Sequence, residues 1–104
     1  MPNFLLVYYG GGMPQTDTER AKVTADWDTW MKQCGDSLVD PGNPCSDAKS
    51  VTKDGVEEVS GKRVTGYSVL KADKLEHAVR AAQMVPLVVD GTGSCEVYET
   101  FPAM

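Results

Sequence analysis

The sequence of 104 residues has few of the side chains on which most catalytic and metal-binding sites depend. It contains a single histidine, His77, and three cysteines that form no Cys-x-x-Cys pattern. One imidazole rules out most histidine-based metal sites, and three widely spaced cysteines favour neither a disulfide framework nor a zinc site. We therefore predict reduced thiols, no bound metal and no cofactor.

Basic clusters and long apolar runs are also lacking. Fifteen Asp and Glu outnumber ten Lys and Arg and give a net charge of −5, whereas binding to a phosphate backbone needs clustered positive charge. The apolar run at residues 4–9 is shorter than the roughly 20 residues of a membrane span, and it lacks the basic lead-in of a signal peptide. These absences predict no nucleic-acid partner, no membrane partner and a cytoplasmic location.

The composition itself is typical of one soluble globular domain. Hydrophobic residues make up 41% of the chain and charged residues 24%, close to the averages of folded domains. The length also matches the usual size of one domain. We therefore expect a single domain over residues 1–104.

The first part of the chain predicts a strand followed by a helix. Residues 4–9 are a continuous apolar and aromatic run that ends at three glycines, typical of a strand buried on both faces. Thr16 and Glu19 have the spacing of a capping box, which predicts a helix that ends near Cys34 with Gly35 as its stop. One stripe of this helix is apolar and should face a core: Val23, Trp27, Trp30, Met31 and Cys34.

The middle of the chain predicts short strands and a hairpin. Residues 37–39 suit a short strand, and the two prolines and one glycine in residues 40–44 predict a loop. Residues 50–53 and 56–59 flank Asp54-Gly55, a pair that suits the tight turn of a β-hairpin.

The last part predicts a strand, a helix and a strand. Residues 64–71 are rich in β-branched and aromatic residues, which favours a strand. Asp73 is the expected N-cap of a helix over residues 74–84, Pro86 is its expected end, and a final strand should cover residues 95–101. The apolar stripe of this second helix is Leu75, Ala78, Val79 and Ala82.

This order of elements predicts an α+β fold of the ferredoxin-like, split βαβ kind with a hairpin insertion. Two helices cover only one face of such a sheet, yet successive side chains of the first strand are apolar on both faces. The strand at residues 64–71 should repeat the pattern, with Val64 and Leu70 on one face and Tyr67 and Val69 on the other. The simplest way to bury the second face of the sheet is a second copy of the chain, which predicts a two-fold homodimer. The alternative is a monomer whose second face is partly shielded by residues 40–47 and the hairpin.

Several strings, in order, resemble a known family. They are residues 4–10, 66–73 and 75–78, Pro86, and residues 96–98. Together they resemble the YCII-related family, which includes relatives named for an Asp-Gly-Pro-Phe motif. The resemblance implies a dimeric α/β barrel, in which two ferredoxin-like sheets close against each other.

The sequence departs from that family at its functional positions. Members with a proposed His–Asp pair carry the histidine on the first helix, where this chain has Thr24, and the aspartate position is Gln33. Residues 54–57 are Asp-Gly-Val-Glu, so the Asp-Gly-Pro-Phe motif is absent. The chain thus resembles a diverged member, and no catalytic residue carries over.

Candidate pocket residues are aromatic side chains and one carboxylate. His77 falls on the polar side of its helix, and a general base must reach its substrate from a pocket, so we expect this histidine to face solvent. Aromatic walls with one carboxylate suit a small-molecule pocket, and the candidates are Tyr9, Trp27, Asp40 and Tyr67. Packing in the core is the alternative for the aromatic residues.

Two functions are compatible with these features. The first is a homodimer that binds a small molecule in a pocket of the barrel, with or without enzymatic activity. The second is a regulatory or protein-interaction domain without catalysis, for which the family resemblance implies a link to sigma-factor regulation. The first function requires a cavity with converging polar groups, whereas the second requires none.

Overall fold

The computed structural model describes residues 1–12 and 14–102. The elements in chain order are β1 (Asn3–Gly10), α1 (Asp17–Cys34), the 3₁₀ turn Gly35–Ser37, β2 (Leu38–Asp40), β3 (Ser50–Thr52), β4 (Gly55–Glu57), β5 (Val64–Lys71), α2 (Leu75–Gln83), α3 (Pro86–Val89) and β6 (Gly93–Glu99).

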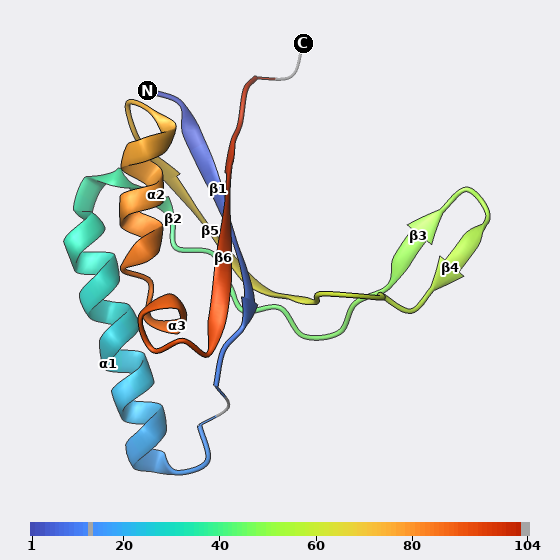
Figure 1. The fold of residues 1–104 in the computed structure, drawn as a ribbon, viewed down its shortest axis with the longest axis horizontal. Coiled ribbons are helices and arrows are strands. Elements are labelled where there is room, and N and C mark those ends of the chain that lie inside the picture. The colour runs from blue at the N-terminus through green and yellow to red at the C-terminus, as the bar shows by residue number, and fades with distance from the viewer. Residues whose placement is uncertain (13, 103–104) are drawn as a thin grey trace.

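In these residues β2, β5, β1 and β6 form one antiparallel sheet in that order. The helices lie on one face of the sheet (Figure 1), and β3 and β4 form a separate hairpin inserted between β2 and β5. The predicted ferredoxin-like α+β fold with a hairpin insertion is confirmed.

The core lies between the sheet and the helices. From the sheet it receives alternate residues of β1 and β5, and from the helices it receives an indole and small apolar side chains. Its buried hydrophobic members are Phe4, Leu6, Tyr8, Trp30, Leu70, Ala78, Ala82, Val85 and Leu87. The other face of the sheet carries no helix (Figure 1), and we call it the open face.

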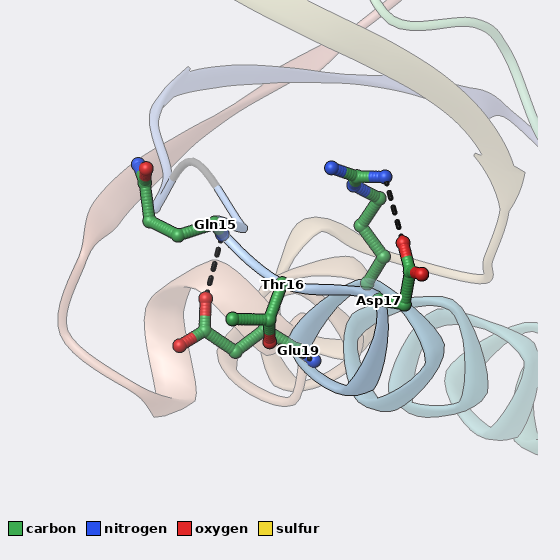
Figure 2. A network of polar contacts seen from close by, with 5 residues as sticks. Gln15, Thr16, Asp17 and Glu19 are labelled. Carbon is green, nitrogen blue, oxygen red and sulfur yellow. Dashed lines mark hydrogen bonds and ion pairs between the residues drawn. The ribbon is translucent and has the colours of Figure 1, made fainter.

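The start of α1 follows the predicted capping box (Figure 2). The Thr16 hydroxyl accepts a hydrogen bond from the Glu19 backbone N–H at 3.1 Å. The Glu19 carboxylate in turn accepts from the backbone N–H of Gln15 at 2.6 Å, one residue before the N-cap. Asp17 and Arg20 form an ion pair in the same turn. The Thr16 bond pairs one of the backbone donors that a helix N-terminus would otherwise leave unpaired, and the other two contacts hold the first turn and the residue before the cap.

The apolar stripe of α1 packs on the core only along its later turns. Trp30 is buried, and Trp27, Met31 and Cys34 are partly buried against the core. Val23 is exposed, contrary to the prediction, because the first turns of α1 extend beyond the end of the sheet (Figure 1).

The second helix differs from its prediction at both ends and in its buried face. Its N-cap is Lys74 and makes no side-chain hydrogen bond, so the cap predicted at Asp73 is wrong, and Pro86 opens α3. Leu75 and Val79 are 43% and 37% exposed. The helix instead presents its alanines to the core, since small side chains allow a close approach.

Several strand predictions are shifted by one or two residues. The strand predicted at residues 37–39 lies at 38–40, and the one predicted at 95–101 lies at 93–99. Thr52 pairs with Gly55, so the hairpin turn is Lys53-Asp54 and not Asp54-Gly55. A register shift between β1 and β5 pairs Val64 with Tyr9, which removes Val64 from the face of Leu70. The Thr65 hydroxyl donates to the backbone at this irregularity, which behaves as a β-bulge.

The chain after β2 is fixed to β5 by a buried hydrogen-bond chain. The Tyr8 hydroxyl donates to Ser68 Oγ at 2.8 Å, and Ser68 donates to the carbonyl of Pro41 at 2.7 Å. Pro44 forms an isolated bridge with Gly66. These contacts set the position from which the hairpin leaves the sheet.

Within the described ranges, none of the helices combines the length and apolarity that a membrane crossing requires.

Candidate functional site

The open face of the sheet carries three rows of paired side chains. The rows follow from the strand registers, because residues paired across antiparallel strands point to the same face. They are Val69, Leu5 and Tyr98; Tyr67, Val7 and Glu96; and Val64, Tyr9 and Ser94. Apolar residues thus fill the centre of the face, and polar groups gather on β6 at its edge.

Glu96 is the centre of the polar groups on this face. Its Oε1 atom accepts a hydrogen bond from the Tyr9 hydroxyl at 2.7 Å and another from the Tyr98 hydroxyl at 2.7 Å. Tyr98 lies two residues along the same strand, and Tyr9 reaches across from β1. In the described part of the chain no donor bonds to Glu96 Oε2, so this oxygen is a free acceptor. We call Tyr9, Glu96 and Tyr98 the open-face cluster.

Hydrogen bonding sets the ionisation of the open-face cluster. The bonds from Tyr98 and Tyr9 lower the pKa of Glu96, with a smaller contribution from the charge of Lys62. The bond to Glu96 raises the pKa of Tyr9 to about 12, and the same cause raises the pKa of Tyr98. At neutral pH the cluster is therefore one carboxylate held by two neutral phenols.

Two further side chains border the open-face cluster. The Lys62 ammonium lies 5.1 Å from the centre of the Tyr9 ring, within the range of a cation–π contact. Tyr67 lies half-buried on β5, and its hydroxyl accepts from the Asn43 side chain at 3.5 Å, a long and weak hydrogen bond.

The four predicted pocket residues do not converge on one site. Tyr9 and Tyr67 lie on the open face. Trp27 lies on the opposite, helix-covered side, where its ring meets Tyr8 edge-on with centroids 5.2 Å apart. The Asp40 carboxylate accepts from the backbone N–H of Gly42 at 2.8 Å and stabilises a turn. Trp27 is thus a packing residue and Asp40 a turn residue.

Sequence reasoning missed Glu96 and Tyr98. Their spacing of two in a predicted strand was the available signal, since it puts both side chains on one face. That signal could not identify Tyr9 as the third member, because the β1–β6 register is a tertiary property.

A concave region lies between α1, α2 and the end of β5. This cleft has a volume of about 330 Å³ and is lined by Trp30, Gln33, Cys34 and His77, among others. Burial raises the pKa of Cys34, which keeps its thiol protonated and unreactive. His77 is exposed, as predicted, at the rim. Among the described residues no three His, Cys, Asp or Glu side chains are grouped as metal ligands.

The two positions of the proposed family His–Asp pair lie in different surroundings. Thr24 is on the exposed part of α1, whereas Gln33 lines the cleft. The open-face cluster is therefore the better candidate site, because it has a charged acceptor with defined partners.

Comparison with known proteins supports the fold. No protein-family model matches the chain, and no curated protein does either. Among solved structures it is similar to 5-chloro-2-hydroxyhydroquinone dehydrochlorinase from Burkholderia phenoliruptrix AC1100, in complex with 2,5-dihydroxybenzoquinone. The match has a TM-score of 0.62 at 14% identity and covers 97% of this chain and 95% of that chain. This similarity establishes a shared fold, and the resemblance to the YCII-related family stays a prediction.

Proposed function

We propose that the chain forms a homodimer through its open faces and that the open face binds a small hydroxylated aromatic molecule beside Glu96. The proposal is carried by the arrangement at Glu96, where two tyrosine hydroxyls share one carboxylate oxygen and leave the other free. A free carboxylate oxygen beside tyrosine rings can accept a hydrogen bond from a ligand that also packs on the rings.

The surface area of the chain supports the dimer. A compact monomer of 11.2 kDa exposes about 5,700 Å², whereas this chain exposes 7514 Å². The excess of roughly 1,800 Å² lies within the range of roughly 1,000 to 2,500 Å² that each subunit of an obligate dimer buries. Leu5, Val7 and Val69 form the apolar centre of the open face, and we expect the second copy to bury these side chains.

The location of the open-face cluster suits a ligand site at the border of such an interface. Glu96 lies on β6, which is an edge strand of the sheet. A ligand beside it can enter from the edge while the apolar centre is covered by the second copy. The tyrosine rings offer flat apolar surfaces, and the ionised carboxylate selects a ligand that carries O–H donors.

Two further observations are compatible with this proposal. The structurally similar dehydrochlorinase was solved with 2,5-dihydroxybenzoquinone, a six-membered ring that also carries two hydroxyl groups. All three cysteines are free thiols, which fits a protein that works in the reducing cytoplasm.

The ligand part is tested with a matched pair of probes. Isothermal titration calorimetry should show that hydroquinone binds, and that 1,4-dimethoxybenzene, which has no O–H donor, binds at least about tenfold more weakly. Glu96→Gln should weaken hydroquinone binding about tenfold or more, because it removes the charged acceptor. Glu99→Gln removes the same charge from the other face of β6 and should leave binding unchanged. Equal binding of both probes, or full binding by Glu96→Gln, would refute the ligand site.

The dimer part is tested by light scattering on a size-exclusion peak. The expected mass is about twice the chain mass of 11.2 kDa. A monomer mass at micromolar concentration would refute the dimer.

A further inference from the structure

The β3–β4 hairpin projects from the body as an arm. We define the arm as residues 49–58, which contain both strands and the turn between them. It forms a sheet of its own and extends away from the body on the side opposite the helices (Figure 1). The arm therefore does not shield the open face of its own chain.

Contacts between the two segments that connect the arm to the sheet, residues 45–49 and 58–65, hold the arm out as a ribbon. The Cys45 N–H donates to the carbonyl of Thr65 at 2.9 Å, and the Arg63 guanidinium donates to the carbonyl of Ser46 at 2.8 Å. Lys49 and Glu58 form an ion pair where the arm begins. These contacts join the two connecting segments next to the sheet and again where the arm begins, so the sheet from which the arm leaves sets its direction.

The arm exposes apolar surface that its own chain does not cover. Val51 and Val56 are paired across the two strands and therefore share one face of the ribbon. They are 72% and 64% exposed. The paired residues on the other face, Ser50 and Glu57, are polar. An isolated two-stranded hairpin is marginally stable in water, so a ribbon with one apolar face is typical of an element that packs on a partner.

The overall dimensions show that the arm makes the chain more extended than a compact domain. The radius of gyration is 15.0 Å, whereas a compact chain of this length has about 13 Å. The arm projects on the open-face side of the sheet (Figure 1). A second copy packed on the open face would lie between that face and the arm.

We propose that the valine face of the arm packs against the second copy and clasps it. This inference rests on the proposed homodimer and adds to it a contact outside the sheet interface. Two-fold symmetry makes the contact reciprocal, so each dimer contains two clasping arms and four buried valines.

The test is a pair of arm variants that change the net charge equally. Val51→Lys/Val56→Lys makes the apolar face charged, and Ser50→Lys/Glu57→Gln makes the same change of two charges on the polar face. Analytical ultracentrifugation should show a dimer dissociation constant raised by at least about tenfold for the valine variant and by less than about threefold for its control. Both variants should keep the monomer fold, because all four positions are exposed.

Hydrogen exchange gives an independent measurement. Amides of residues 50–57 should become more protected as the wild-type concentration rises, and the valine variant should lose this dependence. A dissociation constant unchanged by the valine variant, or arm protection independent of concentration, would overturn the clasp while the dimer itself stands. A monomeric wild type would overturn both proposals.

Discussion

Among the glycines of the chain, Gly42 is the one at which an added Cβ would make the closest contact. Its φ is +76°, and a Cβ there would lie 1.7 Å from the carbonyl oxygen of Tyr67. Gly42→Ala should therefore unfold the protein or destabilise it by more than about 3 kcal/mol, beyond the cost of a left-handed alanine alone.

Gly91 is a matched control for Gly42. It has the same φ of +76°, but a Cβ there meets nothing within 4 Å. Gly91→Ala should cost only about 1 to 2 kcal/mol, the strain of that backbone conformation. Urea unfolding of both variants at one protein concentration measures the difference, and equal costs would contradict the steric account.

The open-face cluster predicts a pH dependence at the residue scale. The pKa of Tyr9 rises from about 10 to about 12 on folding, so its contribution to stability is present below pH 10 and is lost as the pH rises toward 12. The lowered pKa of Glu96 acts in the opposite direction, since its contribution is present above the unfolded pKa and is lost as the pH falls.

Glu96→Gln should bring the pKa of Tyr9 and Tyr98 back toward the ordinary value of a phenol, because it removes the carboxylate that stabilises the protonated hydroxyls. An alkaline titration followed by tyrosinate absorbance measures this shift. Glu99→Gln is the control and should titrate as the wild type does. Identical curves for wild type and Glu96→Gln would show that the cluster does not form in solution.

At the scale of elements, α1 depends on the cap at its first turn. Thr16→Ala removes the acceptor for the Glu19 backbone N–H and should cost about 1 kcal/mol of unfolding free energy. Thr18→Ala, inside the same turn, should be neutral or slightly stabilising because alanine is the better helix former. Chemical denaturation compares the two variants, and a neutral Thr16→Ala would mean that the cap contributes nothing.

Elements with strong local signals were predictable from the sequence, and those set by packing were not. The cap at Thr16 and the span of β5 follow from side-chain chemistry within a few residues. The start of α2 did not, because its position is set by packing of Ala78 and Ala82 on the sheet, without a side-chain cap. The short helix α3 was missed because Pro86 is equally suited to end one helix and to begin another.

At the scale of the whole molecule, the chain has more surface than a compact monomer needs. The helices bury one face of the sheet, whereas the side chains of the open face are only partly buried and the valines of the arm are exposed in the described chain. This shape links the two proposals, because a single second copy would contact both the open face and the arm. Mass measurement tests the first contact, and the arm variants test the second.

The sequence by itself determined the order of the strands and of the two longer helices, the ferredoxin-like fold and a first strand apolar on both faces. These features depend on local periodicity and on the alternation of strand side chains. Only the tertiary structure decided which aromatic residues share a face, because the registers of β1 with β5 and β6 placed Tyr9 beside Glu96 and separated it from Trp27. It also decided that the hairpin projects as an arm, since the contacts that hold its base join residues 45 and 46 with residues 63 and 65.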